Sequence, residues 1–165
     1  MFTKEERKEL MQRFWSQFDE YCDTIPDLAW RKKKWILHDT KISHIDLKFD
    51  IDRDFAMVAL EINHKSEDRR LRVYELVERY RILLEEGFAW GLTWDYCYLN
   101  ANKQEVCRIY VEKRGVDLQQ ISDWDVIYAF FAENMLQLQD NFLEIQEVLK
   151  DEVNRLPTDS TRYLP

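Results

Sequence analysis

The sequence predicts an α+β fold of two layers, in which an antiparallel sheet of about five strands is covered by three helices. Two pairs of segments alternate apolar and polar residues, and each pair is joined by a short polar turn, which is typical of β-hairpins. Other segments repeat apolar residues at helical spacing, and the last of them is the longest. Only three glycines and three prolines interrupt the chain, so its elements should be long. The expected order is α-β-β-β-α-β-β-α.

The composition indicates a single domain, residues 1–156, followed by a C-terminal tail, residues 157–165. The chain has 165 residues, of which 45% are hydrophobic and 14% aromatic, and this is enough to build a core. No apolar run approaches the roughly 20 residues that a membrane helix needs. The charged segment 1–6 does not resemble a signal peptide. We therefore expect a soluble, cytoplasmic protein that does not contact a membrane.

The first helix should begin at Thr3, which forms a capping-box motif with Glu6. Its apolar stripe comprises Leu10, Phe14, Phe18 and Tyr21. Because proline cannot continue a helix, this one should end just before Pro26. A strand at 35–38 is the next element expected.

The first hairpin has a register that the residues themselves specify. Strands are expected at 43–52 and 55–63, joined by a turn at 53–54. In this register the apolar partners face each other: Ile45 with Ile62, Leu47 with Leu60, Phe49 with Val58, and Ile51 with Ala56. A slip of one residue would turn every one of these side chains toward solvent.

A second helix and a second hairpin follow. Ser66 is the expected N-cap of the helix and Gly87 its C-terminal stop. The inward face of the helix comprises Tyr74, Val77, Tyr80 and Leu84. The hairpin should join strands 92–99 and 104–111 through a turn at 100–103. Its expected pairs are Leu92 with Val111, Trp94 with Ile109, and Tyr96 with Cys107.

The last helix is the longest element. Ser122 and Asp125 match a second capping box, and nothing breaks the helical pattern before Pro157. The apolar stripe comprises Trp124, Tyr128, Phe131, Met135, Leu138, Phe142, Ile145 and Leu149. A helix of about thirty residues would be roughly 45–50 Å long. Because this length exceeds the expected breadth of the sheet, the second half should overhang or meet another subunit.

The flanks of this stripe bear on whether the helix forms a coiled coil. A zipper helix usually carries opposite charges beside its apolar seam. Here the flanking positions hold amides instead: Asn134, Gln139, Asn141 and Gln146. This pattern favours the core face of a helix lying on a sheet. A homodimer formed through the far end of the helix is the alternative, and both roles are compatible.

A polar cluster on the second face of the first hairpin is the candidate site. The register places Asp46 opposite Glu61 and His44 opposite Asn63. Paired carboxylates on adjacent strands can hold Mg²⁺ in nucleases, which also need a lysine to orient the attacking water. That lysine should stand two residues after Glu61, where the chain has Asn63. A solvent-facing cluster is therefore favoured, and we expect no metal and no cofactor.

One basic segment stands out in a chain whose net charge is −8. It comprises Trp30, Arg31, Lys32, Lys33, Lys34 and Trp35. Aromatic residues interleaved with cations can stack on and neutralise single-stranded nucleic acid. The favoured interpretation is a solvated strand edge, where lysines discourage unwanted pairing. The acidic net charge also argues against nucleic acid as a partner.

The cysteines do not indicate a metal site. Cys22, Cys97 and Cys107, even with three histidines, are too scattered to supply the roughly four clustered ligands of zinc. No two of them have C-x-x-C spacing. We expect them to be reduced and buried as small apolar side chains.

Several segments between residues 49 and 149 share features with a known family. They are 60–62 closing a strand, the capped helix after His64, 92–95, 108–111, and 115–117 leading into Asp123, Trp124 and the long helix. In these features the chain resembles the bacterial family called domain of unknown function 4268. Members are often the C-terminal part of longer proteins whose first part is nuclease-like, of the PD-(D/E)XK type. The resemblance implies an accessory module of DNA-related or defence systems and assigns catalysis to no residue.

The aromatic content points to a function in binding. Six tryptophans, eight tyrosines and nine phenylalanines exceed what a core of this size readily conceals. Exposed aromatic residues are typical anchors of protein interfaces. We therefore expect a non-enzymatic interaction domain that binds a protein partner or its own copy. The alternative is a nucleic-acid-associated or degenerate PD-(D/E)XK nuclease-like protein.

Overall fold

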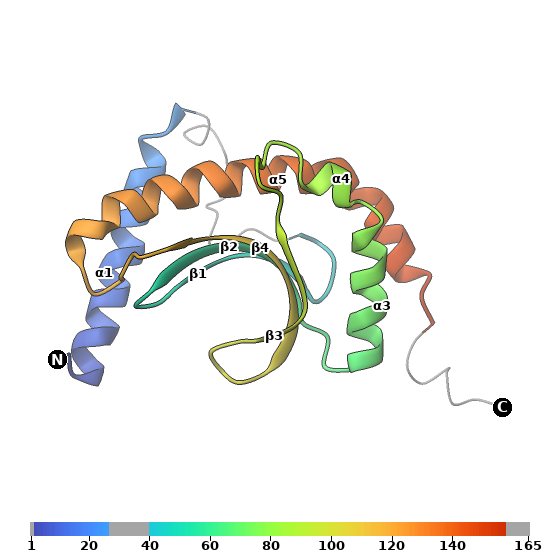
Figure 1. The fold of residues 1–165 in the computed structure, drawn as a ribbon, viewed down its shortest axis with the longest axis horizontal. Coiled ribbons are helices and arrows are strands. Elements are labelled where there is room, and N and C mark those ends of the chain that lie inside the picture. The colour runs from blue at the N-terminus through green and yellow to red at the C-terminus, as the bar shows by residue number, and fades with distance from the viewer. Residues whose placement is uncertain (1, 27–39, 158–165) are drawn as a thin grey trace.

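The computed structural model describes residues 2–26 and 40–157 (Figure 1). Its elements, in chain order, are α1 (Lys4–Asp23), β1 (Ile45–Ile51), β2 (Phe55–Ile62), α3 (Glu67–Glu78), α4 (Arg81–Leu84), β3 (Thr93–Leu99), β4 (Glu105–Arg114), the 3₁₀ turn η2 (Ile121–Asp123) and α5 (Trp124–Asn154). The predicted strand at 35–38 lies outside the described residues.

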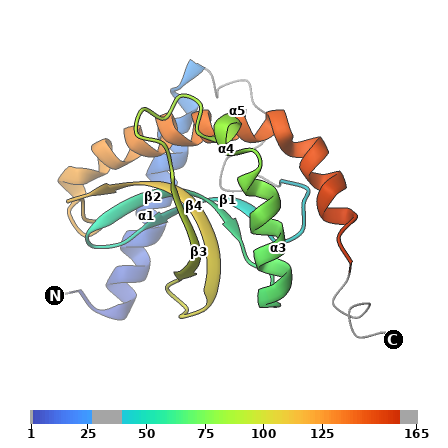
Figure 2. The same ribbon diagram turned by 45° about the vertical axis from the view of Figure 1, so that its right-hand side comes forward.

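The α+β class is confirmed. The described strands form one antiparallel sheet of four in the order β1-β2-β4-β3, so the two hairpins join through β2 and β4. The long α5 lies across one face of this curved sheet, with α1 beside β1 and α3 at the opposite end (Figures 1 and 2). The described residues thus contain four strands where about five were expected, and four α-helices where three were expected.

The predicted register of the first hairpin is confirmed at every pair, from Ile45 opposite Ile62 to Ile51 opposite Ala56. Just beyond the strands, the backbone N–H of Asn63 donates to the backbone carbonyl of His44 over 2.9 Å, as the same register requires. The apolar partners face the helices and are buried except Phe49, which is half-buried. The period-2 pattern therefore determined the pairing, because only this register buries all of them.

The second hairpin follows its predicted register only in part. Trp94 pairs with Ile109 as expected, but Leu92 precedes β3, and a bulge between Asp95 and Tyr98 removes the predicted Tyr96–Cys107 pair. The Asp95 carboxylate accepts a hydrogen bond from the backbone N–H of Cys97 over 3.0 Å. This bond closes the local turn that forms the bulge. After the bulge Tyr98 pairs with Val106, so its ring lies on the face away from the helices.

The predicted second helix is divided in two. The N-cap Ser66 is confirmed, but α3 ends at Glu78, and Tyr80 leaves helical geometry at φ −103° and ψ 19° before α4 begins. After this break, Asn141 on α5 donates to the carbonyls of Leu84 and Glu86 over 2.9 and 2.7 Å. These bonds hold the end of α4 against α5.

The long helix α5 has 31 residues, and all eight residues of its predicted stripe are buried. Its second half overhangs the sheet, as expected, but this chain's own α3 and α4 cover it (Figure 1). Arg69 on α3 donates to the carbonyls of Val153 and Pro157 at the end of α5. The predicted capping box at Ser122 is wrong, since η2 precedes the helix and its N-cap, Asp123, makes no capping bond.

The core between α1, β1 and α5 is aromatic. The capping box of Thr3 and Glu6 is confirmed, and α1 buries Phe14 and Phe18. The ring of Phe18 lies 5.2 Å from Phe49 and 5.5 Å from Phe131, in edge-to-face geometry at both contacts. These contacts fix α1 on the sheet, because aromatic pairs in this geometry add to the free energy gained from burial alone.

Within the described ranges, every helix is either too short or too polar to cross a lipid bilayer.

The expectation that all three cysteines are buried is wrong. Cys97 is exposed at the β3 bulge, Cys22 is half-buried, and only Cys107 is buried. Burial raises the pKa of the Cys107 thiol to about 11. Because the thiolate is the reactive form, this thiol should be inert at neutral pH.

A thiol reagent such as 5,5′-dithiobis(2-nitrobenzoate) should therefore discriminate among the three cysteines. We expect Cys97 to react first, Cys22 more slowly, and Cys107 only after unfolding, with peptide mapping by mass spectrometry as the measurement. Equal labelling of Cys97 and Cys107 in the native protein would contradict the orientation of β4.

Candidate functional site

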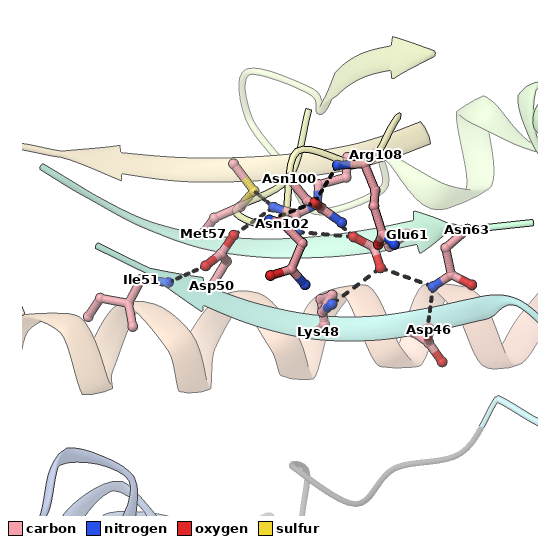
Figure 3. A network of polar contacts seen from close by, with 11 residues as sticks. Asp46, Lys48, Asp50, Ile51, Met57, Glu61, Asn63, Asn100, Asn102 and Arg108 are labelled. Carbon is pink, nitrogen blue, oxygen red and sulfur yellow. Dashed lines mark hydrogen bonds and ion pairs between the residues drawn. The ribbon is translucent and has the colours of Figure 1, made fainter. Parts of the chain in front are cut away.

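A charged network occupies the face of the sheet that points away from α5 (Figure 3). Its centre is Glu61 on β2 and Arg108 on β4, which stand opposite each other and are each only 2% exposed. Arg108 donates through Nε to the Glu61 Oε1 atom over 3.0 Å, and its Nη2 forms an ion pair with the same oxygen, also over 3.0 Å. Its Nη1 reaches Asp50 Oδ2 on β1 over 2.7 Å. The guanidinium thus connects three strands of the sheet.

Because of the bulge in β3, the ring of Tyr98 covers the Arg108 guanidinium. The Cζ atom of Arg108 lies 4.4 Å from the centre of the Tyr98 ring. An unbulged register would place Tyr98 opposite Glu105 and therefore on the helical face. The bulge turns the ring onto the polar face, where it shields Arg108 from water and adds a cation–π contact.

The second oxygen of Glu61 is occupied as well. Oε2 accepts from Lys48 Nζ over 3.2 Å and from Asn63 Nδ2 over 3.0 Å. The same Asn63 nitrogen donates to Asp46 Oδ2 over 2.8 Å and so lies between the two carboxylates. Hydrogen-bonding groups therefore surround both Glu61 oxygens.

These contacts determine the charge of Glu61. Burial alone would raise the pKa of its carboxyl. The hydrogen bond from Asn63 and the charges of Lys48 and Arg108 outweigh burial, so the pKa lies below its usual value. Burial likewise opposes the charge of Arg108, but Asp50 and Glu61 raise its pKa. Glu61 and Arg108 are therefore both ionised in the fold at neutral pH.

The sequence-predicted cluster is only partly assembled. Asp46, Glu61 and Asn63 meet as the register indicated, whereas the His44 ring lies 4.8 Å from the ring of His64 instead. Among the described residues there is no group of three or more histidine, cysteine or acidic side chains that could hold a metal. Cations and an amide already occupy the places where Mg²⁺ would bind Glu61. The basic segment Trp30–Trp35 falls outside the residues that the structure describes.

Sequence reasoning missed Arg108 and Asp50 as members of the network. Each alternates with apolar residues along its strand, which indicates only that it lies on the second face. A buried arginine partner for Glu61 becomes visible only when β2 is paired with β4. No local signal in the sequence specifies that pairing.

A groove of about 720 Å³ adjoins the network, between the β3–β4 turn and the start of α3. Its lining combines amides with charges of both signs and includes Lys48, Glu61, Asn63, Arg70, Asn100 and Asn102. Buried Arg70 donates to the His64 carbonyl over 3.0 Å and lies 3.6 Å from Glu105. Such a lining can hold a polar ligand by hydrogen bonds, but it presents no serine, threonine or cysteine as a nucleophile.

Replacing Arg108 with methionine should destabilise the fold by about 3–5 kcal/mol, because it leaves the buried Oε1 atom of Glu61 without its hydrogen-bond donor and Asp50 without its ion pair. Urea unfolding measures the loss. The double variant Arg108→Met, Glu61→Met should recover most of it, since apolar side chains can replace a buried ion pair.

Arg114 provides the matched control. Its ion pair with Asp54 has the same 3.0 Å separation, but both side chains are mostly exposed. Arg114→Met should therefore change the unfolding free energy little or not at all. A similar decrease in the free energy of unfolding for the Arg108 and Arg114 variants would argue against the buried network.

Glu61 should make stability depend on pH in the acidic range. Since its folded-state pKa lies below the ordinary 4.5, the stabilisation is complete above pH 4.5 and is lost as the pH falls toward the folded-state value. Glu61→Gln should be less stable than the wild type at neutral pH, and the difference should narrow below about pH 4.5. Urea unfolding at a series of pH values measures the difference in unfolding free energy between the two proteins. A difference that does not change with pH would contradict a lowered pKa for Glu61.

Comparison with known proteins places the chain in a family. No curated protein and no solved structure matched it. One family model did match, over residues 10–146, and its description is domain of unknown function, DUF4268. The matched range begins in α1 and ends within α5, so it spans the sheet, the charged network and most of the helical layer. This chain is therefore a member of the DUF4268 family.

Proposed function

We propose that this chain is a non-enzymatic domain that binds a protein partner through an exposed apolar patch. We assign to this patch Ile82 and Leu83 on α4 and Trp90 in the loop that follows, which are exposed and close in sequence. Trp90 is 99% exposed and Ile82 is 87% exposed. Tryptophan is the residue most enriched among the energetic anchors of protein interfaces. The full exposure of Trp90 is the observation that carries the proposal.

The patch has a firm base. A Cβ atom at Gly87 would lie 2.4 Å from the Gln137 side chain, and Gly87 has a φ of +81°. The positive φ favours glycine at this position, and the end of the Gln137 side chain packs against it. Asn141 fixes the preceding carbonyls of Leu84 and Glu86, and the loop is seen passing over α5 in Figure 1. A loop backbone fixed in this way loses little conformational entropy on binding.

The surroundings of the patch favour a basic partner. Between residues 124 and 154, α5 carries seven acidic residues and one lysine. Glu133 and Glu144 are exposed, within about one turn of Gln137 and Asn141, where the loop contacts the helix. A positively charged surface would be attracted to this region, whereas a second copy of the same face would be repelled. A heterologous protein is therefore favoured over the homodimer.

The charged network supports a role without catalysis. Its central carboxylate is bonded at both oxygens, so it has no free position for a metal or a proton transfer. The proposed unit is the single domain, residues 1–156, acting in the cytoplasm. Its apolar patch and its closed network lie on different layers of the fold.

Association with nucleic acid is the second candidate. The basic segment Trp30–Trp35 favours it, as does the expectation that relatives are joined to nuclease-like domains. The net charge of −8 opposes it. Filter binding of single-stranded DNA at low salt, where phosphate contacts are strongest, distinguishes this candidate from the first.

A photo-crosslinking amino acid, benzoylphenylalanine, at position 90 tests the protein-binding function. In cells that express this variant, we expect a covalent adduct of defined mass, identified by mass spectrometry. Glu133→Lys and Glu144→Lys in the same chain should weaken the adduct, because they reverse the charge beside the patch.

The same crosslinker at Tyr96 is the control, since this aromatic side chain is also exposed but lies outside the patch. Equal adducts from positions 90 and 96, or none from position 90, would contradict the proposal. An adduct with twice the mass of the chain would show self-association in place of a heterologous partner.

A further inference from the structure

A second depression, of about 420 Å³, lies where the loop before β1 meets the C-terminal end of α5 and the start of α3. The loop before β1 is seen between α3 and the last turns of α5 in Figure 2. The geometry points to a binding site for a phosphate group here, on a small phosphomonoester or at the end of a nucleic acid strand. This site is separate from the apolar patch and does not depend on the function proposed above.

The charge of its lining is the first argument. Lys41, Arg69 and Lys150 contribute full positive charges, and His44 and His64 contribute imidazoles. No aspartate or glutamate is among the described residues that line it. In a chain with 32 acidic and 24 basic residues, a depression with only basic ionisable groups requires an explanation.

Neutralisation of the helix dipole accounts for Arg69 but not for Lys150. The C-terminal carbonyls of α5 carry partial negative charge. Arg69 donates to one of them, at Val153 over 3.1 Å, and to the Pro157 carbonyl beyond the helix over 2.9 Å. Lys150 is exposed and forms no ion pair with any residue of 2–26 or 40–157. The positive charge of the depression therefore exceeds what the end of α5 requires.

The loop geometry is the second argument. Lys41 and His44 have φ values of 63° and 66°, and in the described ranges only Lys103 is another non-glycine residue with positive φ. The loop is nevertheless held firmly, because the buried Thr40 hydroxyl bonds to Ile42 and Ile45 while Gln146 on α5 donates to the Thr40 carbonyl. Unfavourable backbone conformations held by such contacts are concentrated at binding sites.

The size and the walls of the depression indicate the class of ligand. Pockets for small ligands have volumes of roughly 300–1,000 Å³, so 420 Å³ accommodates more than a bare phosphate ion. Ile42 and Val153 provide an apolar wall, and Ser43 and Asn154 provide uncharged polar groups. This combination suits a phosphate attached to a small organic group, as in a mononucleotide, with the phosphate near the lysines.

Isothermal titration calorimetry with three probes tests the site: inorganic phosphate, adenosine monophosphate, and a short single-stranded DNA with a 5′-phosphate. We expect saturable binding of at least one probe. Lys150→Glu and Lys41→Glu should each weaken it at least about tenfold, because a hydrogen bond to a charged group contributes roughly that much. The probe that binds most tightly identifies the source of the phosphate.

Lys103→Glu is the matched control. Lys103 is also an exposed lysine with positive φ, at 61°, but it lies in the β3–β4 turn and does not line the depression. Unchanged binding in this variant, with wild-type melting temperatures throughout, supports the site. Equal weakening by Lys103→Glu and Lys150→Glu, or no saturable binding by the folded wild type, would overturn it. Crosslinking at position 90 should be unaffected by Lys150→Glu, so the two proposals fail independently.

Discussion

The pairing of β2 with β4 is the constraint on which the rest of the structure depends. Each hairpin is local in sequence, and an isolated two-stranded hairpin is marginally stable in water. When β2 and β4 pair, their helical faces present Leu60 opposite Ile109 and Val58 opposite Val111 as one surface for α5. Their other faces bring Glu61 opposite Arg108. A slip of one residue would expose the apolar set and leave both charges buried without partners, so both faces specify the same register.

The helix α5 connects this sheet to both proposed binding surfaces. Its apolar stripe covers the sheet, while its amide residues bond to loops: Asn141 to the end of α4, and Gln146 to Thr40 before β1. Amides are suited to this role because each can donate to backbone carbonyls without the desolvation cost of a charge. The amide residues that flank the apolar stripe of α5 therefore position the apolar patch and the basic depression.

The two layers of the fold differ in their chemistry. At the centre of the polar face the charges are paired, because Arg108 bonds to both Asp50 and Glu61 and Tyr98 covers its guanidinium. In the helical layer, Trp90 and Ile82 are almost fully exposed. The buried charges of the network thus favour one register of the sheet. The exposed apolar patch is the surface on which binding of a partner would be favourable, because it would remove apolar side chains from water.

The sequence by itself determined the features that depend on near neighbours in the chain. The first hairpin's register, the Thr3 capping box, the Ser66 N-cap and the buried stripe of α5 are periodic or local, and all were predicted correctly. Tertiary contacts decided the rest. The position of the end of α4 depends on Asn141, more than 50 residues away, and the loss of the Ser122 cap follows from the turn η2 that precedes α5.

Some residues of the candidate site could likewise be predicted from the sequence, and others could not. Asp46, Glu61 and Asn63 come together within one hairpin, so their proximity could be read from alternation alone. Arg108 joins them from a strand 47 residues from Glu61, and the exposure of Trp90 depends on how a loop lies on α5. Periodicity states which side of an element a residue occupies, but the identity of the neighbouring element depends on the free energy of the whole packed chain.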